Sequence, residues 1–352
     1  MKKHVLGLIA LLAACPATPS AADPVADFYR GKQMQFIIRT PPGGDYDSYS
    51  RLLARHMGRH IPGNPTITPI NMPGGGGIIA ANHVGQVAPR DGTILTMVSQ
   101  GLPVDQALQL SPGLRVDLRS FNWIGNLANA NQLLVVWHTS KVKTLAEAKA
   151  TETLIGSTGA GSISVQLPAF YNNVLGTKFK IILGYQGGQD VDLAMERGEV
   201  DGRGTNTYTG YQTSKPHYLA DKLIIPLIQV GLAREAELAD TPLLLDQPVQ
   251  PQDKPLLDFM SRAVTVGRPV ATTPGVPAER VAALRKAFMD TLADPEFIAD
   301  AKQQNAEVRP MTGEVLQTTV RDLIEAPQSV RNRVKIALQP KASDTLESVP
   351  KR

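Results

Sequence analysis

The stretch MQFIIRTPPGGDYDSYSRLLARHMGRH, residues 34–60, decides the fold. Residues 34–38 are mostly apolar and predict a strand, and Pro-Pro-Gly-Gly at 41–44 predicts a turn. From Asp45 onward a helix is indicated, because one set of side chains recurs at helical spacing: Tyr49, Leu52, Leu53, His56, Met57 and His60. Strand, glycine turn and helix in this order favour an α/β fold.

The same order repeats along the chain. Residues 66–71 predict a strand, 73–77 a turn, 78–87 a helix and 93–99 a strand. Further strands are expected at 133–137, 153–157, 180–184 and 223–230, and helices at 145–149, 164–175, 190–197, from 278 onward and at 315–324. With 352 residues, at ~100–200 per domain, the chain can form two cores with mostly parallel sheets.

The composition excludes several classes of protein. Charged residues make up 19%, and there are 30 Gly and 27 Pro, which argues against a coiled coil or a disordered chain. The net charge is only +4 and no basic block occurs, so nucleic acid is not an expected partner.

Residues 1–22 have the pattern of a secretory signal peptide. Lys2 and Lys3 precede an apolar run at 5–14, and Ser20-Ala21-Ala22 provides a small-residue exit. The run is shorter than the ~20 residues that span a bilayer, so an exported, periplasmic protein is expected. Cys15 is the single cysteine, so an intrachain disulfide is excluded. Cys15 is either a small residue of the leader or a site of lipidation, because Leu12-Ala-Ala-Cys15 resembles a lipobox.

Glycine-rich turns precede predicted helices at 41–44, 73–77 and 156–162. A helix start exposes free backbone N–H groups, and glycine lets a ligand approach them, so such a turn can hold an anion. A tight connection between strand and helix is the alternative for each turn alone. Three such turns in one chain favour anion binding.

Other chemistry finds little support in the sequence. The segment 75–80 fits the dinucleotide pattern G-x-G-x-x-A, but Pro73 interrupts the preceding strand, and neither a P-loop nor G-x-S-x-G is present. His56 and His60 have metal-ligand spacing without a third ligand nearby, so they are interpreted as core or boundary histidines. We therefore expect no cofactor, no metal, no catalytic residue and no enzymatic activity.

Several motifs in a fixed order carry a family resemblance. They are Pro41-x-Gly43-Gly44-x-x-Asp47, the segments 71–77 and 89–95, the turn at 156–162, Gly184-Tyr185-Gln186-Gly187, Asp192-Leu193 and the segment 197–201. Together they cover most of the mature chain, which resembles the Bug family, the substrate-binding proteins of tripartite tricarboxylate transporters. It departs from the family by lacking a tryptophan at 262–269, by its tail after Gln339 and by Tyr46 at a variable position.

The resemblance implies a two-lobed periplasmic binding protein of the type II-like class, in which each lobe is a sheet flanked by helices. The signal peptide would be residues 1–22, the first lobe 23–128 plus 263–352, and the second lobe 129–262. The chain would cross between lobes near 127–130 and 262–269.

The function implied is capture of a small carboxylate, a di- or tricarboxylate of aliphatic or aromatic kind, between the lobes of a monomer. The protein would deliver it to the membrane permease subunits of the transporter. Two alternatives stay open: a periplasmic enzyme acting on a carboxylated substrate, and a sensor subunit that presents its ligand to a membrane receptor.

The resemblance also implies the ligand-binding residues, which come from both lobes: Pro42, Gly43, Gly44, Tyr46, Asp47, Gly75, Gly76, Ser157, Thr158, Gly159, Ser162, Arg203, Thr205, Asn206 and Thr207. Among them Arg203 lies between two glycines, and its guanidinium can grip a distal carboxylate through two parallel hydrogen bonds. A surface arginine in a glycine turn is the alternative interpretation.

Overall fold

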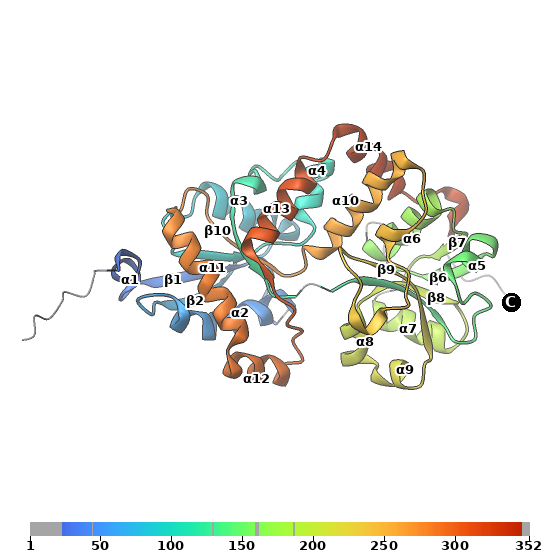
Figure 1. The fold of residues 1–352 in the computed structure, drawn as a ribbon, viewed down its shortest axis with the longest axis horizontal. Helices are drawn as coiled ribbons and strands as arrows, with labels where there is room; N and C mark the ends of the chain where they lie inside the picture. The colour runs from blue at the N-terminus through green and yellow to red at the C-terminus, as the bar shows by residue number, and fades with distance from the viewer. Residues whose placement is uncertain (1–22, 44, 129, 159–161, 186, 347–352) are drawn as a thin grey trace, which may run out of the picture.

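Two six-stranded sheets form the centres of two lobes (Figure 1). The computed structural model describes residues 23–346 apart from 44, 129, 159–161 and 186, so the leader segment and Cys15 lie outside the described residues. The strand order is β11-β4-β10-β3-β1-β2 in the first sheet and β12-β7-β6-β8-β5-β9 in the second. The predicted two-lobed α/β fold is confirmed.

The first lobe contains α1 (Pro24–Tyr29), β1 (Gln33–Ile38), α2 (Asp45–Met57), β2 (Thr66–Asn71), α3 (Ile78–Gln86), β3 (Ile94–Met97), α4 (Leu102–Leu108), β4 (Asn122–Asn126), β10 (Pro269–Thr272), α11 (Ala278–Ala293), α12 (Pro295–Gln303), β11 (Met311–Thr312) and α13 (Gly313–Ile324). The second contains β5 (Gln132–Trp137), α5 (Leu145–Ala150), β6 (Thr153–Gly156), α6 (Ile163–Phe170), β7 (Phe179–Ile182), α7 (Gly188–Glu196), β8 (Gly202–Asn206), α8 (Tyr208–Ser214), α9 (Pro216–Ala220), β9 (Ile224–Val230) and β12 (Thr345–Leu346). Two helices, α10 (Lys254–Thr265) and α14 (Gln328–Ala337), pack against each other, and α14 contacts both α4 and α6.

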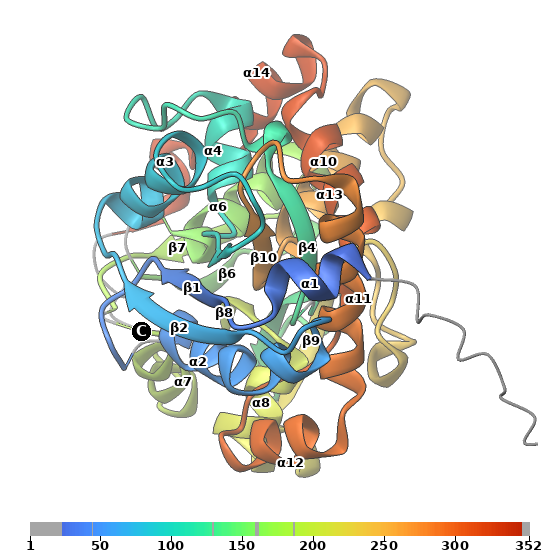
Figure 2. The same ribbon diagram turned by 90° about the vertical axis from the view of Figure 1, so that its left-hand side faces the viewer.

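Helices cover both faces of the first sheet. Phe36 and Ile38 of β1 pack in one apolar cluster with residues of α2 and α11, whereas Ile37 between them packs with residues of α3, α4 and α13. Seen from the first lobe, α3 and α4 lie on one side of β1 and β2, and α2 lies on the other (Figure 2). The alternation of a strand therefore sorts its side chains between two helical layers.

The sheets are more mixed than the mostly parallel arrangement that the sequence predicts. In the first sheet β1 runs parallel to β2 and β3, but β10 runs antiparallel to β3 and β4. In the second, β6 runs parallel to β7 and β8, but β5 runs antiparallel to β8 and β9. The reason is that the chain passes between the lobes twice. Strands β5 and β10 are the first strands after each passage, so each enters its sheet in the direction opposite to the neighbouring strands.

The two segments that join β4 to β5 and α10 to β10 lie side by side. The Leu127 N–H donates to the Arg268 carbonyl at 3.2 Å, and the Arg268 N–H donates to the Ala128 carbonyl at 3.3 Å. Gly267 has φ +55°, and a Cβ there would lie 1.9 Å from the Ala128 oxygen. Only glycine fits this close approach, so the paired crossing depends on Gly267.

The tail returns to the second lobe. Strand β12 pairs in parallel with β7, and the Asn173 side chain donates to the carbonyls of Ala337 and Gln339 at 3.0 Å each. The sequence placed all of 263–352 with the first lobe, so the position of β12 differs from that division. A two-residue strand has no periodic pattern from which it could be predicted.

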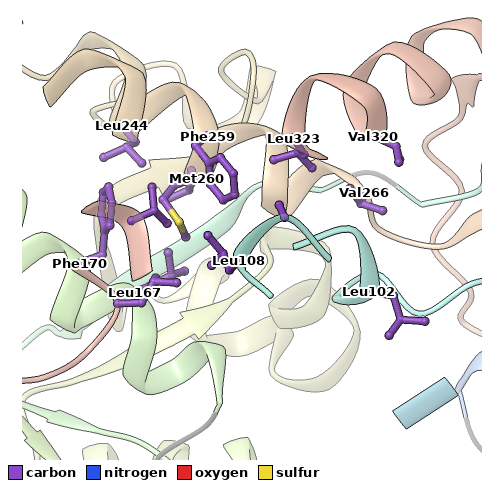
Figure 3. Packing of buried hydrophobic residues seen from close by; sticks show 14 of the residues in the cluster. Leu102, Leu108, Leu167, Phe170, Leu244, Phe259, Met260, Val266, Val320 and Leu323 are labelled. Atoms are coloured by element: carbon purple, nitrogen blue, oxygen red, sulfur yellow. The ribbon is translucent and has the colours of Figure 1, made fainter. Parts of the chain in front are cut away.

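An apolar cluster continues from one lobe into the other (Figure 3). It includes Leu108 of α4, Phe170 of α6, Met260 of α10 and Leu323 of α13, all buried. The lobes are therefore joined by apolar packing around α10 as well as by the crossing segments. No helix among the described residues is long and apolar enough to cross a membrane.

Helix α2 and the residues that follow it are fixed to α12 and its N-cap by an ion pair and by hydrogen bonds between histidines and carboxylates. Arg55 and His56 lie 2.9 Å from the Asp300 carboxylate, and the His60 ring lies 2.8 Å from Asp294. The two histidines are thus boundary residues paired with carboxylates, as the sequence interpretation held. In the part of the chain that the structure describes, no group of three or more His, Cys, Asp or Glu side chains could hold a metal ion.

These pairs predict an acid-dependent loss of stability. Hydrogen bonds from His56, Gln304 and Arg55 lower the pKa of Asp300 to about 2. Because an unperturbed Asp has a pKa of about 3.9, the ionised Asp300 stabilises the fold above that pH, and its contribution is lost as the pH falls toward 2. Asp300→Asn should therefore lower the Tm at pH 7, and the difference from wild type should shrink between about pH 4 and 2.

Circular-dichroism melting across this pH range checks the prediction. Asp290→Asn is the control, since among the residues that the structure describes Asp290 pairs with the exposed Lys286 of its own helix. A Tm difference for Asp300→Asn that does not change with pH would contradict the assignment.

Candidate functional site between the lobes

Asp47 organises the first glycine turn. Its carboxylate is buried and accepts hydrogen bonds from the Gly43 N–H at 2.9 Å, Arg51 Nε at 2.9 Å and Asn71 Nδ2 at 2.8 Å. Burial opposes ionisation of Asp47, but these hydrogen bonds outweigh it and lower its pKa. The Gly43 N–H is therefore already satisfied, and Asp47 acts as a positioning residue for the turn.

The second glycine turn carries four consecutive residues with positive φ, Gly74 to Gly77. Such a path is open to glycine and strained for other residues. The turn follows the carboxyl end of β2 and leads into α3, whose N-cap, Gly77, has no side-chain capping hydrogen bond, so the first N–H groups of α3 lack a capping side chain. Gly75 and Gly76 are exposed there, as an anion-binding turn requires.

Arg39, which the sequence analysis did not single out, joins the two turns. It follows β1 directly, and its guanidinium lies 3.7 Å from the centre of the Tyr46 ring. Its Nη1 donates to the Gly76 carbonyl at 3.3 Å, and its buried Nε has no hydrogen-bond partner among the described residues. A half-buried cation thus lies between the glycine turns.

Tyr46 connects the first lobe to the crossing. Its buried hydroxyl accepts from the Gln100 N–H at 3.2 Å and donates to the Gly267 carbonyl at 3.4 Å. The Arg268 guanidinium lies 5.0 Å from the Tyr46 ring centre and 5.6 Å from that of Tyr49, and it donates to Gln100 Oε1 at 3.3 Å. Arg268 is thereby held beside the crossing.

A cavity of about 160 Å³ lies at this point and takes its walls from both lobes. Tyr49, Gln100 and Glu307 belong to the first lobe, and Gln132 and Thr207 to the second. The remaining lining residues lie in or beside the crossing segments: Ala128, Ala130, Val264, Gly267 and Arg268. We call it the interlobe cavity. Gln100 and Arg268 on one side and Gln132 on the other can donate hydrogen bonds to an anion, whereas Glu307 can only accept them.

A second cavity, of about 200 Å³, lies within the second lobe at the start of α6. It brings together four residues that the sequence predicted as ligand contacts: Thr158, Ser162, Arg203 and Thr205. The Ser164 hydroxyl, which the sequence analysis did not name as a ligand contact, lies 2.7 Å from the Ser162 hydroxyl and 3.1 Å from that of Thr158. The predicted Ser157 is fully buried behind them and donates to the Ser164 carbonyl.

Arg203 is neither on the surface nor free to bind a ligand with its whole guanidinium. Its Nη1 lies 2.8 Å from Asp192 Oδ2, and its Nε donates to the Thr205 carbonyl at 3.0 Å. The two charged side chains are 16% and 1% exposed. Burial raises the pKa of Asp192, against the opposing effect of Arg203. The pair holds β8 against α7.

The other predicted residues have the following places. Thr207 caps α8 through its hydroxyl and lines the interlobe cavity, and Asn206 accepts from the Thr207 N–H. Pro42 and Gly43 are exposed on the first turn and line neither cavity. Gly44 and Gly159 lie outside the described residues.

Four further residues at the site were not predicted from the sequence: Gln100, Gln132, Arg39 and Arg268. Of these, Arg39 alone has a recognisable sequence context, since it lies between a strand and a glycine turn.

Two lobes, two central sheets and a cavity at the crossing define the chain as a two-lobed periplasmic binding protein fold. A TctC solute-binding protein from Polaromonas, solved without ligand, has a TM-score of 0.69 and 19% identity and matches 87% of this chain and 97% of that one. The periplasmic binding protein BugD has a TM-score of 0.53 and 20% identity, over 88% and 99% of the two chains. MatC from Rhodopseudomonas palustris, solved with malate, has a TM-score of 0.54 and 20% identity, over 87% and 99%.

Proteins that are similar in sequence are also Bug and UPF0065 proteins. Protein BugT of Bordetella pertussis is 34% identical over 108 residues, which are 30% of this chain and 32% of BugT. A UPF0065 protein of Agrobacterium vitis is 26% identical over 228 residues, 60% of this chain and 62% of that protein. The chain thus matches less than two thirds of each of these relatives, and no family model matches it. These relatives confirm the resemblance predicted from the motifs: the chain is related to the Bug proteins.

Proposed function

We propose that this protein is an extracytoplasmic solute-binding protein that captures a small carboxylate between its lobes. The interlobe cavity carries the proposal, because both lobes contribute polar groups to it and the Arg268 guanidinium stands in its wall. Solved proteins of the same fold from Rhodopseudomonas palustris contain adipate and malate, which supports a carboxylate as the ligand here.

The walls suit a carboxylate, because Arg268 adds a positive charge and the one acid among the lining residues that the structure describes, Glu307, is paired with Arg309 at 3.3 Å. A guanidinium binds a carboxylate through parallel N–H groups, and the amides of Gln100 and Gln132 add neutral donors from opposite lobes. Arg39 and the N–H groups at the start of α3 offer a second positive region beside the glycine turns, where the backbone sites proposed from Gly75 and Gly76 lie. A ligand held from both lobes stabilises the closed arrangement.

The role proposed is binding and delivery, not turnover. The sequence motifs contain no nucleophile paired with a base, and the solved neighbours named above include binding proteins. Residues 1–22 would export the chain to the periplasm and be removed; the alternative is lipidation of Cys15, in which only the residues before it are removed and the protein keeps a lipid anchor. The monomer would then deliver its ligand to the permease subunits of a tripartite tricarboxylate transporter.

A thermal-shift screen of mono-, di- and tricarboxylates on the mature protein tests the binding step. A ligand that binds only the folded state at 100 times its Kd adds about 2.7 kcal/mol of stability, a clear rise in Tm. A matched set of uncharged amides is the control and should produce no shift. If no carboxylate raises the Tm, the proposed function is wrong; a deletion strain that grows but loses uptake of the identified acid would support delivery to a permease.

Closure of the lobes on the ligand is a further expected result. Because the cavity has donors on both lobes, saturating ligand should draw them together, and small-angle scattering should give a smaller radius of gyration than without ligand. The Arg268→Ala variant at the same ligand concentration should keep the larger value. Superimposable curves for the wild-type protein with and without ligand would argue against a closing mechanism.

A further inference from the structure

We propose that the ligand is a monocarboxylate with an apolar body, and that this body occupies a second chamber beside the interlobe cavity. The inference rests on the proposed function and specifies its ligand class. It differs from the di- or tricarboxylate that the family resemblance implies.

The chamber adjoins the interlobe cavity. Gln100, Gln132 and Val264 line both, so a ligand anchored at Arg268 has direct access to the chamber. Its walls come from α4 of the first lobe, the start of α6 in the second, α10 and the end of α14. A molecule lying in it would contact both lobes, as a ligand that promotes closure must.

Most residues in the chamber walls are apolar, and the polar side chains among them are Gln100, Asp105, Gln132 and Gln166. The apolar lining side chains are Val104, Leu110, Ile163, Met260, Ala263, Val264 and Leu338. Leu110 and Ile163 are 41% and 36% exposed, which leaves large apolar surface facing solvent at positions that a ligand can cover. Covering apolar surface is favourable, and each buried methylene is worth about fourfold in Kd.

The size of the chamber limits the body of the ligand. Its volume is about 240 Å³. An apolar cavity of roughly 150 Å³ in another protein accommodates benzene. The chamber therefore suits one aromatic ring with a short linker, or an alkyl chain of comparable length.

The charged side chains determine which end of the ligand lies in the chamber. The interlobe cavity holds Arg268 and Glu307, and the Glu307 carboxylate is paired with Arg309 Nε at 3.3 Å. Asp105 lies in the wall of the chamber and accepts a hydrogen bond from the Ser111 hydroxyl at 2.8 Å. A carboxylate is attracted to the first region and repelled from the second. A second carboxylate at the far end of the ligand would face Asp105, so an uncharged end is preferred.

Calorimetry with four probes tests this inference: acetate, hexanoate, 3-phenylpropanoate and adipate. Hexanoate and adipate have the same carbon chain and differ in the second carboxylate. We expect hexanoate and 3-phenylpropanoate to bind at least about tenfold tighter than adipate and acetate, because only they place an uncharged apolar body in the chamber.

Two variants test whether the apolar body of the ligand lies in the chamber. Ala263→Phe fills the chamber and should weaken hexanoate at least about tenfold while leaving acetate unchanged, with Ala282→Phe on the exposed face of α11 as the control. Asp105→Asn keeps an acceptor for Ser111 but removes the charge, so adipate should bind tighter and hexanoate should not change.

The outcomes separate the two proposals. If adipate binds best and neither variant alters its affinity, the chamber does not receive the ligand and the inference is wrong, while carboxylate binding stands. If none of the four probes and no member of the carboxylate screen binds, the proposed function itself is wrong.

Discussion

Replacing Arg268 by alanine should weaken binding of the carboxylate by about 10- to 150-fold, the value of a hydrogen bond to a charged partner of about 1.5–3 kcal/mol. Arg268 is held beside Tyr46 and Tyr49 and donates to Gln100, so its guanidinium is pre-oriented in the cavity wall. Titration calorimetry with the tightest acid from the screen measures the effect.

Two variants control this prediction. Arg268→Lys keeps the charge but loses the planar fork, so its affinity should fall between those of the wild type and the alanine variant. Arg262→Ala changes a nearby arginine that pairs with Asp258 and Asp322 and does not line the cavity, so its affinity should match the wild type. Equal losses for Arg262→Ala and Arg268→Ala would mean that the effect is structural.

Asp192→Ala should destabilise the fold by about 3 kcal/mol, the lower end for a broken buried ion pair, since it leaves the largely buried Arg203 guanidinium without its charged partner. Asp192 is 1% exposed, and its carboxylate accepts from Arg203 Nη1 at 2.9 and 2.8 Å. Urea unfolding followed by tryptophan fluorescence and circular dichroism measures the free energy of unfolding.

The double variant Asp192→Leu with Arg203→Met should recover most of this loss, because an apolar pair of similar volume replaces a buried ion pair at little cost. A loss below about 1 kcal/mol for Asp192→Ala would show that Arg203 finds another partner or reaches solvent. The pair also changes the expectation for ligand selection: Arg203→Ala would act on stability first, so any loss of affinity must be measured where the variant is still folded.

Strand–turn–helix units were predictable because their signal is local. The strand at 66–71 coincides with β2, and the helix at 78–87 ends one residue beyond α3. Strand β8, Gly202–Asn206, was not predictable as a strand from its apolar pattern, since Gly-Arg-Gly-Thr-Asn has none. It is a strand because it completes the second sheet between β6 and β5.

The candidate site was predictable only in part for a related reason. Glycine turns before helices are visible in the sequence, and the structure places Thr158, Ser162, Arg203 and Thr205 around one cavity. The interlobe cavity instead joins Gln100 to Arg268, 168 positions apart, and takes Gln132 from the other lobe. Which side chains meet at the crossing depends on how the two sheets are joined, and no local pattern encodes that.

A crystal structure of the mature protein grown with the tightest-binding carboxylate tests the central claim most directly. We predict density for the acid between the lobes, with its carboxylate within hydrogen-bond distance of Arg268 and contacts from Gln132 or Thr207 of the second lobe. Density for the acid on one lobe only, or at a position remote from Arg268, would contradict the account.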